Sequence, residues 1–213
     1  MRFERSMTST LQPRKSSAFF TRLRTDHASQ IAEFAISLPL LVVFLVGIYD
    51  FSGAIALKQK LTNAAREGAR IAAADPSNDL SGTAAVMPVS VSDALQVIDN
   101  YLLSERLNDC GLSGTTPVAS STVIWTFTAS GCTGTSLTLT INRGYYLSAN
   151  ATAAPPATCT VSAGGAVSQA VIATCVTIQY PYVWKFSRVS GLFGGSFLGP
   201  STITTTAVMF NEN

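Results

Sequence analysis

An uncharged and strongly apolar run, Phe34–Tyr49, constrains the fold of this chain more than any other feature. An α-helix rises about 1.5 Å per residue, so about 20 residues cross the roughly 30 Å hydrocarbon layer of a bilayer. The run reaches that length if Glu33 and Asp50 lie at the two interfaces. Residues 1–28 carry six basic and two acidic side chains, which predicts a cytoplasmic N-terminus. We therefore predict a single-pass membrane protein whose C-terminal part is extracytoplasmic.

Two other interpretations fit the apolar run less well. A basic start, an apolar stretch and the small residues around Ala54–Ala56 also fit a secretory signal cleaved before Leu57, which would release a secreted binding domain. The run is long for such a signal, and Asp50 precedes the cleavage site. A buried helix of a soluble protein is disfavoured because the run is apolar on all sides.

The helical pattern continues beyond the apolar run to Ala74, and Asp75-Pro76 ends it. Pro39 is expected to kink this helix, because proline removes one backbone hydrogen bond. Small residues at spacings of three and four form one helix face: Ala64, Ala65, Gly68, Ala69 and Ala72. This face either contacts another subunit at close range or packs against the domain of the same chain.

The remainder of the chain predicts one helix and about four strands. The helix covers Ser92–Leu107, with Ser90 or Ser92 as its N-cap and Cys110-Gly111 as its stop. Alternating, β-branched segments predict strands at 122–129, 136–141, 170–184 and 202–209, with Pro181 weakening the third. Residues 149–156 and 191–200 are expected to be loops, and the apolar, glycine-rich stretch 191–199 either meets a partner or folds onto its own core.

The predicted fold class is α+β. A long N-terminal transmembrane helix, pilin-like in shape, precedes a small domain with one helix on an antiparallel sheet of about four strands. The predicted divisions are a basic cytoplasmic leader (1–28), a transmembrane and projecting helix (29–75) and an extracytoplasmic domain (76–213).

Four cysteines, Cys110, Cys132, Cys159 and Cys175, lie far apart in the second half of the chain. They form no CxxC pair, so we expect no metal site and favour two disulfides formed in an oxidising compartment. Buried thiols are the alternative. Four cysteines allow three pairings; we favour Cys110 with Cys132 and Cys159 with Cys175.

Catalytic and nucleic-acid-binding roles are not expected. The single histidine, His27, precedes the apolar run, so the usual triads and zinc-hydrolase sites are missing from the exported part. The sequence has no phosphate-binding glycine motif, and its net charge is only +2. We expect no enzyme activity, no cofactor, no small-molecule substrate and no nucleic-acid partner.

The N-terminal third resembles the TadE-like family. The resemblance rests on the Glu33-Phe34 pair before the apolar helix, on Asp50 beside aromatic residues at its end, and on the following NAAREGAR. The C-terminal TITTTAVMFNEN is similar, more loosely, to the closing strand of the family. The resemblance implies a pilin-like minor component that takes part in assembly, initiation or capping of a Tad (Flp) pilus. A permanently membrane-tethered envelope structural protein or adhesin with the same anchor is the alternative.

The resemblance also implies roles for single residues. Pilin-like leaders are removed by a prepilin peptidase, and the family pattern places the cut between Ala28 and Ser29, with Ala28 where glycine is usual. The Glu33 carboxylate would then neutralise the new amine of a neighbouring subunit, or it merely marks the end of the span. Asp50 is expected to reach the outer headgroups, or else to contact a partner helix. Implied partners are the peptidase, other pilins or minor pilins, and inner-membrane lipid.

Overall fold

The computed structural model describes residues 26–76, 78, 80, 86–148, 158–159, 170–185 and 199–212. The chain forms two compact units, Met1–Leu45 and Val46–Asn213. The second unit begins earlier in the chain than the domain boundary drawn from the sequence, because residues 46–74 pack with the residues that follow them.

The long N-terminal helix α1 covers Asp26–Ala74 and continues through Pro39. It ends one residue before Asp75-Pro76, as expected from the missing backbone donor of proline. Within α1, Gln30–Ala74 is long and apolar enough to cross a membrane. Its large side chains between Ile31 and Leu45 are exposed in the isolated chain, so lipid or other protein has to cover them.

The second unit contains one further α-helix, α2 (Val89–Ser104), and a short 3₁₀ turn, η3 (Leu112–Gly114). The N-cap of α2 is Pro88 and not Ser90 or Ser92, because both serines lie inside the first helical turn. The helix also ends before the predicted Cys110-Gly111 stop: Glu105 caps it, and Arg106 then adopts a left-handed backbone with φ of 57°.

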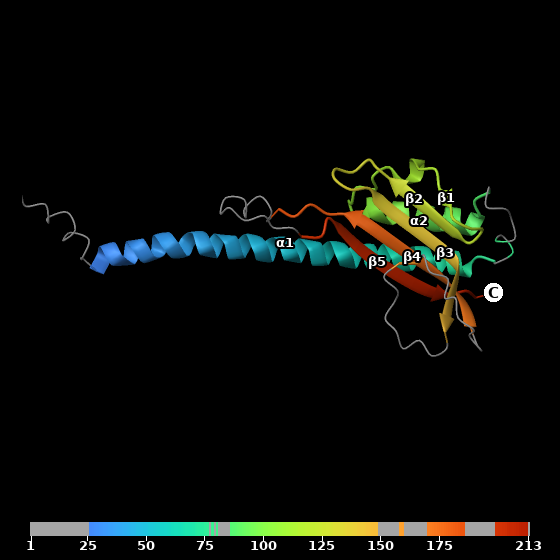
Figure 1. The fold of residues 1–213 in the computed structure, drawn as a ribbon, viewed down its shortest axis with the longest axis horizontal. Helices are drawn as coiled ribbons and strands as arrows, with labels where there is room; N and C mark the ends of the chain where they lie inside the picture. Colours follow the sequence, from blue (N-terminus) through green and yellow to red (C-terminus); the bar gives the residue numbers. More distant parts are fainter. Residues whose placement is uncertain are drawn as a thin grey trace, which may run out of the picture. The chain divides into compact units, whose positions relative to one another are not determined.

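An antiparallel sheet lies against the helices (Figure 1). It has five strands and not four, in the order of the chain: β1 (Val118–Ala119), β2 (Ile124–Ala129), β3 (Leu137–Ser148), β4 (Ala170–Pro181) and β5 (Thr202–Phe210). β4 stops at Pro181, earlier than the predicted residue 184. β3 runs past its predicted end because a bulge between Asn142 and Tyr145 lets pairing with β4 resume.

The two faces of the sheet differ as strand alternation requires. Phe127, Leu139 and Ile178 share one register row on the buried face, where α1 and α2 cover them. Adjacent residues in the strands point to the opposite face, where they form a row of threonines: Thr126, Thr140, Thr177 and Thr206. Each fully buried leucine, isoleucine or phenylalanine contributes about 1.5–3 kcal/mol, so the helix-covered face holds the domain together.

Arg143, which lies 68 residues after Asp75 in the sequence, binds the end of α1. It is fully buried in the bulge of β3, and its Nη2 donates to the Asp75 carbonyl oxygen at 2.8 Å. The last carbonyls of a helix have no partners within the helix and carry its negative dipole end. A buried guanidinium therefore satisfies one of them and ties the helix to the sheet.

Candidate functional site

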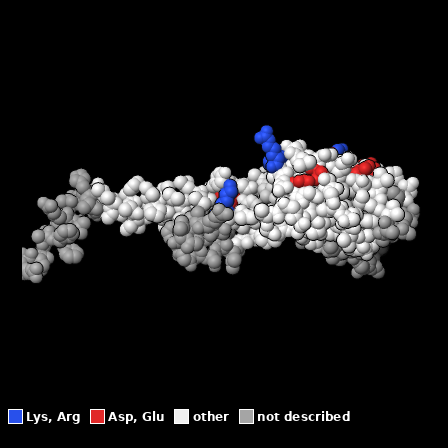
Figure 2. Space-filling model, turned by 90° about the horizontal axis from the view of Figure 1, so that it is seen from above, with Lys and Arg blue, Asp and Glu red and all other residues white. Residues whose placement is uncertain are grey.

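The predicted processing site lies at the start of α1. Ala28 and Ser29 belong to the first helical turn, and Glu33 and Phe34 follow one turn later with exposed side chains. On the face seen in Figure 2, the apolar stretch of α1 shows no charged side chain. The sequence explains this, since no charge occurs from Phe34 to Tyr49.

Asp50 ends the uncharged run, but it does not point outward as predicted. Its exposed fraction is only 2%, and the Tyr182 hydroxyl lies 3.0 Å from its Oδ1 and 3.1 Å from its carbonyl oxygen. The Asp50 side chain is therefore turned into the protein and not outward as expected. A buried carboxylate needs hydrogen bonds to compensate for lost hydration, and Tyr182, which follows β4, supplies one.

The same contact changes the chemistry of Tyr182. Partial burial, together with the hydrogen bond to Asp50 and its negative charge, raises the pKa of Tyr182 to about 12. The phenol keeps its proton and donates a hydrogen bond to Asp50.

Aromatic residues surround this contact. The ring centroids of Phe51 and Trp184 are 5.4 Å apart, and those of Tyr182 and Trp184 are 4.9 Å apart in an edge-on arrangement. Lys185 Nζ lies 5.2 Å from the centre of the Tyr49 ring. Such geometries are favourable for aromatic pairs and for a cation over a ring. We call these five residues the aromatic cluster: Tyr49, Phe51, Tyr182, Trp184 and Lys185.

The small-residue face of α1 lies inside the second unit. Ala64, Ala65, Ala69 and Ala72 have no exposed surface, and Gly68 packs directly against Ile98 of α2. In the structure, the small-residue face packs against the domain of the same chain and not against another subunit. Ala64, Ala65 and Gly68 are therefore not available to another subunit while this unit is folded, which corrects their assignment as assembly contacts.

The four cysteines form two disulfides, which we call the first disulfide (Cys110–Cys132) and the second disulfide (Cys159–Cys175). This is the pairing that we favoured. The first links the turn after α2 to the β2–β3 connection, and the second joins Cys159 to β4. Asn142 Nδ2 also donates to the Cys159 carbonyl oxygen at 2.8 Å. Cys159 is thus held on the outer face of the sheet.

One pair of carboxyl groups lies near the first disulfide. Asp99 of α2 is 8% exposed, and Asp109 is close to it. Burial, and then the negative charge of Asp109, raise the pKa of Asp99, while a hydrogen bond with Ser113 lowers it.

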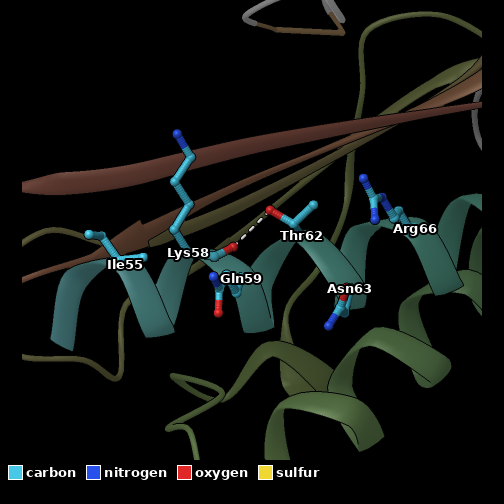
Figure 3. A pocket seen from close by; sticks show the side chains of 6 residues that line it. All are labelled: Ile55, Lys58, Gln59, Thr62, Asn63 and Arg66. Atoms are coloured by element: carbon cyan, nitrogen blue, oxygen red, sulfur yellow. Dashed lines mark hydrogen bonds between the residues drawn. The ribbon is translucent and has the colours of Figure 1, made fainter. Parts of the chain in front are cut away.

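Two shallow hollows border the exposed side of α1. One, of about 480 Å³, is lined by Ile55, Lys58, Gln59, Thr62, Asn63 and Arg66. Figure 3 shows Lys58, Thr62 and Arg66 on one side of the helix and Gln59 and Asn63 on the other. The other, of about 280 Å³, lies between Phe51, Trp184 and Ile203. In the described part of the chain, no group of three or more His, Cys, Asp or Glu residues could hold a metal ion.

The predicted apolar, glycine-rich contact loop lies almost entirely outside the described residues. Two features of the structure were not predicted from the sequence. Tyr182 and Trp184 were predicted to end a strand, whereas they follow β4 and contact Asp50 and Phe51 of α1. Arg143 was overlooked, because nothing in its neighbourhood along the chain distinguishes it from a surface arginine.

Comparison with known proteins supports the resemblance at the N-terminus. The family model described as TadE-like protein matches residues 28–70, about a fifth of the chain. This match confirms the resemblance seen in the sequence, and it covers the apolar stretch of α1 and most of its small-residue face. No curated protein and no solved structure matches the chain.

Proposed function

We propose that this chain is a minor pilin, or pseudopilin, of a Tad (Flp) pilus system, with a structural and non-catalytic role. It is anchored in the inner membrane by α1, with its N-terminus in the cytoplasm and its second unit extracytoplasmic. The observation that carries the proposal is the TadE-like match over residues 28–70, which coincides with a helix long and apolar enough to span a membrane.

The difference in burial between the two halves of α1 supports this role. From Val46 onward the helix belongs to the folded unit, and its small residues are buried there. From Ile31 to Leu45 its large side chains stay exposed. A protein that passes from a membrane into a helical assembly needs such a surface, because lipid covers it first and neighbouring helices cover it afterwards.

Glu33 has a specific part in the proposal. Cleavage between Ala28 and Ser29 creates a new amine close to the membrane boundary. A buried charge without a partner costs several kcal/mol, so pairing between this amine and the Glu33 carboxylate of a neighbouring subunit would favour the correct register. The proposed partners are accordingly the prepilin peptidase, the other pilins or minor pilins of the system, and lipid.

The decisive experiment determines the N-terminal residue of the protein from native membranes, with and without the prepilin peptidase. A start at Ser29 that depends on the peptidase is the expected result. An intact N-terminus would favour the permanently tethered envelope protein or adhesin, and a start at Leu57 would mean that the apolar run is a secretory signal.

The role of Glu33 is tested separately. Glu33→Ala should impair piliation while the amount of protein in the membrane stays unchanged. Glu67→Ala is the matched control, because Glu67 lies on the same helix and pairs only locally with Arg70 in an exposed ion pair, which is worth little. Equal piliation in both variants would refute the assembly role of Glu33.

A further inference from the structure

The aromatic cluster lies where the uncharged run of α1 ends. Residues 34–49 carry no charge and cover about 24 Å of helix, slightly less than the roughly 30 Å hydrocarbon layer. Tyr49 is the last residue of this run, and Phe51 is the second residue beyond it, after Asp50. In a membrane-anchored chain, they therefore fall at the level of the headgroups.

Residues 182–185, which supply the rest of the aromatic cluster, are held in place by hydrogen bonds of their polar groups. Trp184 Nε1 donates to the Pro200 carbonyl oxygen at 2.7 Å, and the Tyr182 amide donates to the Ser201 carbonyl oxygen at 2.8 Å. The Tyr182 hydroxyl is used by Asp50. The polar atoms of these rings are thus satisfied within the protein, and the segment is fixed against α1.

Apolar surface remains outside. The exposed fraction is 66% for Tyr49 and 56% for Phe51. It is 60% for Val183, which lies between Tyr182 and Trp184 in the sequence. Tryptophan and tyrosine are enriched at membrane–water interfaces, and lysine near the surface is attracted by anionic lipid. The negative charge of Asp50, by contrast, is turned inward. The outer surface of the cluster therefore offers aromatic rings and the ammonium group of Lys185 and withholds the nearby carboxylate.

We propose that the aromatic cluster is a second membrane contact, which binds the headgroup region of the bilayer and sets the depth of α1. The inference rests on the membrane anchoring proposed above. A phospholipid surface is favoured over a protein partner because the cluster continues the apolar run of α1, and because it combines aromatic rings with an exposed lysine. The second unit would then rest on the membrane surface. The contact joins two parts of the chain that are far apart in sequence, since Tyr182 lies 132 residues after Asp50.

Trp184 provides the probe. The chain has two tryptophans, and Trp125 is a core residue with 3% exposure. The full-length Trp125→Phe variant, which keeps only Trp184, is reconstituted into phosphatidylcholine vesicles containing phosphatidylglycerol. Nitroxide groups are carried by the lipid headgroup or by the end of the acyl chain. The Trp184→Phe variant, which keeps only Trp125, is the control.

We expect headgroup-labelled lipid to quench Trp184 roughly twofold or more over chain-end-labelled lipid, as for an interfacial residue, and neither lipid to quench Trp125. Lys185→Glu should weaken the headgroup quenching in vesicles with phosphatidylglycerol. If Trp125→Phe does not fold, the difference in quenching between the wild type and Trp184→Phe isolates the Trp184 signal.

Two results would overturn the inference. In the first, aqueous acrylamide quenches Trp184 and the lipid quenchers do not. In the second, neither acrylamide nor lipid quenches Trp184, which would place it against another protein. Failure of the anchoring itself is recognised separately, because the chain would not float with vesicles after an alkaline wash.

Discussion

Replacing Gly68 with alanine tests the packing of α1 on α2 directly. A methyl group at this position would lie 2.4 Å from Cδ1 and 2.6 Å from Cγ1 of Ile98, whereas carbon atoms in contact are ordinarily about 3.5–4.0 Å apart. Overpacking costs about 1–3 kcal/mol, and alanine in place of helical glycine returns about 1 kcal/mol. Because Ile98 is fully buried and the overlap is large, we expect the upper end of the cost. The free energy of unfolding should fall by about 2 kcal/mol.

The assay is urea unfolding of the full-length protein in mild detergent, followed by the fluorescence of its two tryptophans, Trp125 and Trp184. Gly53→Ala is the matched control on the same helix, since its added methyl would lie 3.5 Å from the Tyr182 hydroxyl, an ordinary contact. This control should be neutral or stabilising by up to about 1 kcal/mol. Ile98→Val removes the atom nearest the clash, so the double variant with Gly68→Ala should be about 1 kcal/mol more stable than the sum of the single effects.

A stabilising Gly68→Ala, equal to Gly53→Ala, would refute the close approach of the two helices. Unchanged stability combined with loss of piliation would instead show that Gly68 contacts another subunit, which is one of the two alternatives that the sequence leaves open. The same substitution therefore distinguishes packing within the chain from assembly between chains.

Three further outcomes are expected from urea unfolding of variants. Arg143→Met should lower the free energy of unfolding by about 3 kcal/mol, because the Asp75 carbonyl loses a buried, charged donor. Asp99→Asn should stabilise the protein at neutral pH. The raised pKa of Asp99 means that the folded state binds this proton more tightly than the unfolded state, so the stability from this group is present in acid and lost as the pH rises through the folded pKa. The gain from Asp99→Asn should therefore vanish below the ordinary pKa of aspartate, and a gain independent of pH would contradict this explanation. Serine at both cysteines of the second disulfide should cost about 3 kcal/mol, because that bond closes a loop of 16 residues; an unchanged urea midpoint under non-reducing conditions would count against it.

The elements predicted well are those whose signal is local. The absence of charge from Phe34 to Tyr49 is enough to define an apolar helix, and the alternation of threonine with larger apolar residues defines β2, β3 and β5. β1 was missed because two residues, Val118 and Ala119, are too short to show a period. The start of α2 was placed too late because serine is a good N-cap in general, whereas here Ser90 is buried in the helix and Pro88 takes the capping position.

The candidate site was less predictable, because its contacts join distant parts of the chain. Asp50 and Tyr182 are 132 residues apart, and Arg143 and Asp75 are 68 apart. Nothing next to Asp50 in the sequence shows that its carboxylate is turned inward. The small-residue face was recognised, but a face that permits close packing does not specify which helix packs on it. Only the fold assigned that face to Ile98 and its neighbours.

The position of β5 near the end of the chain means that the sheet is completed late in synthesis. The Thr62 hydroxyl donates to the Lys58 carbonyl oxygen, so it accepts a hydrogen bond from Thr205, 143 residues later. β5 is also the strand that lies at the C-terminal edge of the sheet. The part of α1 around Thr62 therefore gains this partner last, once Thr202–Phe210 has been synthesised. We expect a chain truncated before β5 to lack the Thr62–Thr205 contact and to leave this part of α1 more open to proteases.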